Sequence, residues 1–274
     1  MVNFNPIGDL NMKKPIRLSA VLFAALLSAV ISVPAGAEIS TLAEAINKAG
    51  RQRMLSQRIV KNYCLIGMDI MKEAATKQLD ASIKLFNSQL EELKGFTPTD
   101  KVKQRVEKVV TLWGPFQEVA RVAPTKESCE ALNEAGEDLL SNSHKIVLAL
   151  ADFSGSSSGK IINISGRQRM LSQRIAKYHI MYAWDLGDSE VMDNLNRGMV
   201  EFQGAQVLLF QSKMNTPEIR DLLVQVKRQI KPLQKIIGQK KDKYWVEEVV
   251  KNTDVILKDM NTVTGLYQQA AENM

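Results

Sequence analysis

Aromatic residues, cysteine and histidine are scarce in this sequence, and each shortage excludes a kind of site. Aromatic side chains make up only 6% of the 274 residues, too few for the stacking platforms that bind single-stranded nucleic acid. The two cysteines and the two histidines lie far apart in the chain. They cannot assemble a zinc or haem site, so no metal or cofactor is expected.

A strong excess of one charge is also missing. The formal net charge is +6, but residues 1–37 contribute three basic side chains and one acidic one. The rest of the chain therefore carries 33 basic and 29 acidic residues, a net charge of +4. So weak a bias does not indicate a nucleic-acid partner.

Only one apolar run approaches the length of a membrane-directed segment. It extends from Leu18 to Val33 and is followed by Ala35-Gly36-Ala37. Three basic residues precede it: Lys13, Lys14 and Arg17. This order is typical of a secretory signal peptide over residues 1–37, cleaved before Glu38, and predicts a periplasmic protein with no stable membrane insertion.

Two points about this segment stay open. A retained membrane anchor is the alternative, although the apolar run is short for a membrane span. Translation from Met12 would give a more typical signal peptide than translation from Met1.

An identical repeat organises the remainder of the chain. The segment Gly50–Ile59, GRQRMLSQRI, recurs unchanged at 166–175, an offset of 116 residues. At the same offset Asp138-Leu139-Leu140 aligns with Asp254-Val255-Ile256. The sequence therefore predicts a tandem duplication, with units at 38–153 and 160–274 joined by a flexible Ser/Gly linker at 154–159.

Each unit shows helical periodicity, and its helix breakers divide it into four segments. In the first unit we expect one helix over 41–72 and a second ending at Gly95. Thr97-Pro98 opens the third, and Thr125 caps a fourth that runs to 152. The second unit breaks at 187–188, 215–217 and near 238. The predicted fold is all-α: two tandem antiparallel four-helix bundles that form an intramolecular pseudo-dimer.

The two cysteines test this arrangement. Counting along antiparallel first and fourth helices places Cys64 and Cys129 at the same level, where the second unit has Ile180 and Trp245. In an oxidising exported compartment a disulfide is expected, with two buried free thiols as the alternative.

One cation stands out on the first helix. When that helix is wound at 100° per residue, an apolar face gathers small and hydrophobic residues together with a single arginine. The face comprises Ile46, Ala49, Gly50, Arg53, Gln57, Val60 and Cys64. A buried guanidinium needs an anionic or carbonyl partner, and Arg169 repeats the anomaly. The alternative is that Arg53 reaches solvent or pairs with Glu137 or Asp138.

The opposite side of the first helix is polar, and we expect it to face solvent. It comprises Glu44, Asn47, Arg51, Arg58, Lys61 and Asp69. The two histidines, His144 and His179, have no partner at ligand spacing and are expected to be ordinary helix residues.

The segment from Ile46 to Ile59 resembles the signature of a periplasmic domain shared by type IV pilus chemotaxis transducers and nitrate/nitrite sensor kinases, the PilJ/NarX type. This resemblance implies a four-helix bundle that dimerises through its first helix. In the nitrate sensors, an arginine of that helix binds a small oxyanion on the dimer axis. The candidate ligand-binding residues that follow are Arg53, Arg169, Gly50, Gly166, Lys48, Gln57 and Gln173.

The chain departs from that family in two ways. We expect no cytoplasmic signalling module in it. In the second copy Ile164 and Ser165 replace Lys48 and Ala49, so a site built from both copies would be asymmetric.

We interpret the chain as a sensory protein whose two bundles lie parallel, so that Arg53 and Arg169 face each other. At about 8 Å and an effective dielectric near 20, two such cations repel by roughly 2 kcal/mol. A small oxyanion, nitrate or nitrite first, would remove that repulsion. An envelope signalling protein would then respond to the ligand-bound state. The alternative is a structural module with no small-molecule ligand. With no nucleophile–base pair in view, we do not expect an enzyme.

The leader generates the first prediction. N-terminal sequencing of the protein from a periplasmic fraction should give a chain that begins at Glu38, because the Ala-x-Ala site precedes that residue. A mature chain beginning at or before Met12 would contradict it.

Overall fold

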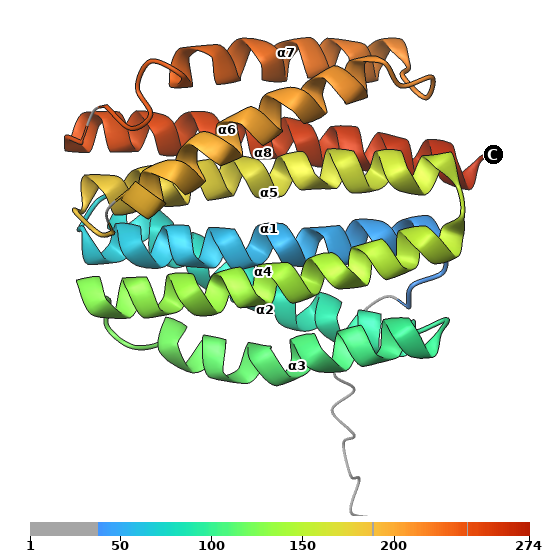
Figure 1. Cartoon of the computed structure of the whole chain (residues 1–274), viewed down its shortest axis with the longest axis horizontal. Coiled ribbons are helices and arrows are strands. Elements are labelled where there is room, and N and C mark those ends of the chain that lie inside the picture. The colour runs from blue at the N-terminus through green and yellow to red at the C-terminus, as the bar shows by residue number, and fades with distance from the viewer. Residues whose placement is uncertain (1–37, 188, 240) are drawn as a thin grey trace, which may run out of the picture. The chain divides into compact units, whose positions relative to one another are not determined.

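Figure 1 presents the computed structural model of the chain, which describes residues 38–187, 189–239 and 241–274. These residues belong to one compact unit. The signal peptide predicted for residues 1–37 lies outside the described residues. Within them there are eight helices and no strand, which confirms the all-α prediction. None of the described helices is long and apolar enough to cross a membrane.

The helices fall into two sets of four. The first set is α1 (Leu42–Gly67), α2 (Lys72–Gly95), α3 (Asp100–Ala120) and α4 (Lys126–Ser154). The second set is α5 (Ser157–Ala183), α6 (Ser189–Phe210), α7 (Pro217–Leu233) and α8 (Lys243–Glu272). Four threonines cap helix N-termini by accepting a backbone N–H at the third helical position: Thr41, Thr99, Thr125 and Thr216.

Two predicted boundaries were wrong. The first helix ends at Gly67 rather than near 72, because Asp69 and Met71 take left-handed φ values of 55° and 49° and turn the chain into α2. The linker is also shorter than its composition predicted. Ser156 caps α5 by accepting the backbone N–H of Gly159 at 3.1 Å, so 157–159 is the first turn of a helix.

Helices α1 and α5 lie at the centre and run side by side in the same direction (Figure 1). Each packs against two helices of its own repeat, α1 on α2 and α4, and α5 on α6 and α8. The short α4–α5 connection causes the parallel orientation, because it starts α5 at the end of the molecule where α1 also starts. Helices α3 and α7 pack on the outer side of α4 and α8.

The repeat offset changes from 116 to 117 residues between the first and second halves of each bundle. Gln57 donates to the carbonyl of Gly136, and its repeat Gln173 donates to that of Thr253, both at 3.4 Å. The extra residue lies between α6 and α7, since Leu93 and Leu209 still correspond in the core. The predicted alignment of Asp138 with Asp254 was therefore wrong: Glu137 is the counterpart of Asp254.

The same shift changes the counterpart of Cys129. Val246, which is fully buried, takes the place predicted for Trp245.

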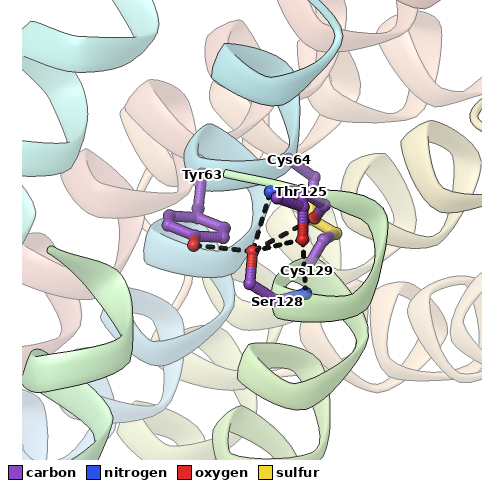
Figure 2. The surroundings of a disulfide bond; sticks show 5 residues. All are labelled: Tyr63, Cys64, Thr125, Ser128 and Cys129. Carbon is purple, nitrogen blue, oxygen red and sulfur yellow. Dashed lines mark hydrogen bonds between the residues drawn. A yellow bond between two sulfur atoms is a disulfide. The ribbon is translucent and has the colours of Figure 1, made fainter. Parts of the chain in front are cut away.

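A disulfide ties the start of α4 to α1 (Figure 2). It joins Cys64 to Cys129, whose Cα atoms are 5.6 Å apart. Beside it, the Tyr63 hydroxyl donates to Ser128 Oγ at 2.9 Å, and Ser128 and Thr125 cap each other's backbone N–H groups. The N-terminal turn of α4 is thus held to α1 by one covalent bond and one hydrogen bond.

Removing this disulfide should destabilise the fold measurably. The Cys64→Ala/Cys129→Ala double variant should unfold with a free energy lower by roughly 4 kcal/mol, because the bond closes a loop of 65 residues in the unfolded chain. Denaturant titration with and without a reductant measures the loss. The reductant should weaken the wild type and leave the double variant unchanged, and non-reducing peptide mapping should find the linked pair. Two freely alkylated thiols in the folded wild type would contradict the assignment.

Candidate functional site

The two copies of the repeated motif meet where α1 crosses α5, and a glycine from each helix lies at the crossing. A β-carbon on Gly50 would stand 3.3 Å from Arg53 Nη2 and 3.4 Å from Arg169 Nη2. A β-carbon on Gly166 would stand 3.1 Å from Arg169 Nη2 and 3.4 Å from Arg53 Nη2. Glycine inside a helix costs about 0.5–1 kcal/mol relative to alanine. That cost is offset here because both guanidinium groups occupy the space that side chains would take.

The two arginines are almost completely withdrawn from solvent, with exposed fractions of 1% for Arg53 and 0% for Arg169. Arg53 donates from Nη1 to Asn163 Oδ1 at 2.9 Å and from Nη2 to the Asn163 carbonyl at 3.2 Å. Arg169 donates from Nη2 to the Asn47 carbonyl and from Nη1 to Asn261 Oδ1, both at 3.2 Å. Each arginine therefore crosses to the first helix of the other repeat and finds neutral acceptors.

These partners leave the two buried charges uncompensated. In the described part of the chain, no carboxylate oxygen lies within 4.0 Å of either guanidinium. The Nε atoms of Arg53 and Arg169 are buried and have no hydrogen-bond partner among the described residues. A buried donor without an acceptor costs about 1–3 kcal/mol, and more when it is charged.

Burial has a marked effect on the acidity of both groups. Burial, and then the nearby cation Arg167, lowers the pKa of Arg53 to about 9, so this group stays protonated at neutral pH. Burial also lowers the pKa of Arg169 well below its ordinary value, and Arg51 and Arg53 act in the same direction. The site therefore holds a positive potential in a region from which water is largely excluded.

The carboxylate considered as a partner for Arg53 is engaged elsewhere. Glu137 accepts from Lys177 at 2.7 Å and from Arg174 at 2.8 Å. Its counterpart Asp254 accepts from Lys61 at 2.6 Å. All three ion pairs join the two repeats: the two of Glu137 lie between α4 and α5, and that of Asp254 lies between α1 and α8. The alternative in which Arg53 pairs with Glu137 is therefore wrong, because that carboxylate binds Lys177 and Arg174 instead.

Two residues of the expected solvent-facing stripe are buried, which corrects that prediction. Lys61 is 0% exposed and Asn47 is 7% exposed. The reason is that α1 packs against α2, α4, α5 and α8, so its second face is also covered. Asn47 and Lys61 contact the other repeat instead of solvent, through Gln268 and Asp254.

The structure brings together most of the candidate residues that the sequence indicated. Arg53, Arg169, Gly50 and Gly166 lie at the crossing, and the fully buried Gln57 and Gln173 lie about one turn further along their helices. Lys48 is the exception. Its Nζ contacts Glu44 at 2.7 Å and Glu92 at 2.5 Å, and it makes no contact with the arginines.

His144 belongs to the site, although we expected it to be an ordinary helix residue. Its Nδ1 lies 3.0 Å from Arg53 Nη1 and must accept that hydrogen bond, which leaves the proton of the neutral ring on Nε2. Burial, followed by the charges of Arg53 and Arg167, lowers the pKa of His144 to about 4. Asn261 stands at the corresponding position of α8 and contacts Arg169, but the changed repeat offset hid this relation in the sequence.

The ion pairs between the repeats generate a prediction for stability. Glu137→Gln should lower the free energy of unfolding at pH 7 by roughly 3 kcal/mol, because Lys177 would stay buried without its carboxylate. Glu73→Gln is the matched control, since the Glu73–Lys77 pair is exposed and should contribute little. Equal stability of the two variants in denaturant titration would contradict the role assigned to Glu137.

The same pairs make the fold sensitive to acid. Burial alone would raise the pKa of Glu137, but Lys177 and Arg174 outweigh it and hold that pKa below its ordinary value of 4.5. Lys61 likewise outweighs burial at Asp254 and holds its pKa below 3.8. The folded protein then binds fewer protons than the unfolded chain as the pH falls below 4.5, so stability falls with pH. Glu137→Gln should reduce this loss, which denaturant titrations between pH 6 and pH 3 measure.

Comparison with known proteins identifies the family of this chain. The family model for the type IV pili methyl-accepting chemotaxis transducer N-terminal domain, PilJ, matches residues 37–139 and 153–254. No curated protein and no solved structure matches the chain. The two matches together cover more than half of the sequence, and each contains one copy of the motif and its buried arginine. The chain therefore belongs to the PilJ family and carries two copies of its domain.

Proposed function

We propose that the protein is an exported sensory protein that binds a small planar oxyanion, nitrate or nitrite first, between Arg53 and Arg169. One observation carries the proposal: both guanidinium groups are buried and, among the residues that the structure describes, have only neutral partners and an Nε–H without an acceptor. Membership of a transducer family supports a sensory rather than an enzymatic role.

A planar oxyanion suits the chemistry of this crossing. A guanidinium can donate two parallel hydrogen bonds to two oxygens of one anion. The Nε of each arginine is available for such a pair, and both Nη2 atoms lie against the same two glycines. One negative charge placed there would offset the repulsion between two cations in a poorly hydrated region. Nitrate and nitrite are small, flat and singly charged, as the NarX-like part of the resemblance also implies.

Such binding would produce a signal because the two arginines come from different repeats. The anion would contact α1 and α5 together and would favour arrangements in which the two helices stay close. A ligand shifts a conformational equilibrium only by the difference in its affinity for the two states. The partner that responds to the shift would be an envelope sensor or signalling protein, since the predicted leader would direct this chain to the periplasm.

The alternative function is that of a structural module of the cell envelope that binds no small molecule. The carbonyl contacts of Arg53 and Arg169 with Asn163 and Asn47 favour this alternative, because they join the repeats without any ligand. The missing carboxylate favours the anion site. Binding measurements separate the two.

The proposal predicts stabilisation by ligand. Nitrate at a hundred times its dissociation constant should raise the free energy of unfolding by about 2.7 kcal/mol over a chloride control at matched ionic strength. Arg53→Ala should remove this effect while the protein stays folded, because the change relieves repulsion as it removes the site. Arg53→Lys should also fail, since an ammonium group cannot supply the planar pair of donors. Thermal and chemical unfolding with isothermal titration calorimetry measure these outcomes.

Two further variants keep the test decisive. Arg51→Ala changes the neighbouring arginine of the same motif and should leave nitrate binding nearly intact. Gly166→Ala should keep the fold and weaken binding, because its β-carbon would stand 3.1 Å from Arg169 Nη2 and fill space at the crossing. If nitrate and nitrite stabilise the wild type no more than chloride does, the structural-module alternative takes the place of the anion site.

A further inference from the structure

A polar cavity lies beside the crossing, between α4 and α5. Its volume is about 180 Å³. Three arginines, a histidine, a serine and one glutamate supply its polar lining: Arg53, Arg167, Arg174, His144, Ser141 and Glu137. Arg169 does not contribute to it, so the cavity is distinct from the space between the two central arginines.

The charges that line this cavity leave it positive. Glu137, the one carboxylate of the lining, already accepts from Lys177 and Arg174. Arg167 donates to Glu201 at 2.7 Å, and Arg53 has no carboxylate partner within the described ranges. The neutral state of His144 follows from burial and from the repulsion that Arg53 and Arg167 exert on its proton. An anion in the cavity would meet this field directly.

The remaining walls are apolar and indicate what kind of anion fits. Leu140 and Met170 line the cavity with the polar residues. An anion without carbon atoms would leave these side chains against water or against its own charge. A carboxylate with a short carbon chain would place its charged end at the arginines and its methylene groups at the apolar wall. The volume is below the range of about 300–1,000 Å³ typical of drug-sized ligands, which restricts the ligand to a small acid.

The cavity has no chemical equivalent in the other half of the pseudo-dimer. At the corresponding positions along α8, Lys258 replaces Ser141 and Asn261 replaces His144. The arginines do recur, with Arg51 in the place of Arg167 and Arg58 in the place of Arg174. A ligand of this cavity would therefore occupy one half of the molecule only.

We propose that this cavity, formed by Arg53, Arg167, Arg174, His144 and Ser141 against Leu140 and Met170, is a binding site for a small organic carboxylate of two to four carbon atoms. The site bridges α4 of the first repeat and α5 of the second. It shares Arg53 with the proposed oxyanion site but does not include Arg169.

The pseudo-symmetry of the chain supplies a matched pair of variants for the test. Titration calorimetry would use acetate, propionate and succinate at constant ionic strength, with chloride and nitrate as controls. Arg167→Gln should weaken binding of the best carboxylate by about tenfold, because it removes a charge-assisted hydrogen bond. Arg51→Gln replaces the arginine at the same motif position in the first repeat. It should change the affinity for the carboxylate by less than about twofold.

A site on the pseudo-twofold axis would respond equally to Arg51→Gln and Arg167→Gln, so equal losses would overturn the proposal. Binding of nitrate measured in the same variants reports on the central site separately. The measurements can therefore exclude the carboxylate site or the oxyanion site independently.

Proton NMR locates the ligand directly, because the chain has only two histidines. The ring signals of His144, assigned with His144→Asn, should shift on addition of the carboxylate, and those of the buried His179 should stay in place. The anion should also raise the pKa of His144, since it offsets the field of Arg53 and Arg167. No carboxylate binding beyond the chloride control, or binding that leaves the His144 signals unmoved, would also overturn the proposal.

Discussion

Two like charges buried at one helix crossing are the constraint on which the rest of this structure depends. Arg53 and Arg169 can lie at the crossing only because each finds a backbone carbonyl on the opposite helix and because glycine leaves room for both. Those carbonyl contacts require α1 and α5 to run parallel and in register. The parallel orientation in turn requires a short connection between α4 and α5, which Gly155 provides with a φ of 61°.

The sequence predicted the helical architecture and the central arginines, and it did so for identifiable physical reasons. Helix breakers mark most of the helix ends, although not the turn from α1 to α2, and a ten-residue identity reveals the duplication directly. Arg53 could be singled out because a permanent cation on an apolar face violates the usual pattern of burial. The buried state of Lys61 could not be predicted in this way. Amphipathic analysis assumes one covered face, whereas α1 is covered by four neighbours and hides its cations in ion pairs with the other repeat.

The role of His144 was not predicted from the sequence for a different reason. One extra residue between α6 and α7 shifts the repeat offset to 117 in the last two helices of each bundle, so that His144 corresponds to Asn261 and Glu137 to Asp254. A shift of one residue rotates a helix by about 100° and moves a contact residue to another face. The sequence shows this offset at Pro115 and Pro232, but the match of Asp138 with Asp254 favoured the wrong alignment of α4 with α8. The backbone contacts of Gln57 and Gln173 establish the correct one.

Buried positions of the two repeats match closely, and exposed ones do not. The core residues Phe86 and Phe202 are both fully buried, whereas Val207 and Leu208 of α6 are 56% and 52% exposed where α2 has Glu91 and Glu92. In a dimer of identical chains, every substitution appears on both sides of the axis. A tandem chain is free of that restriction, and it keeps its halves at a high effective concentration whatever the protein concentration. One half can therefore acquire a histidine and a serine beside its arginine while the other keeps the asparagine and a lysine. The fused arrangement can hold a symmetric centre and a one-sided cavity in the same molecule.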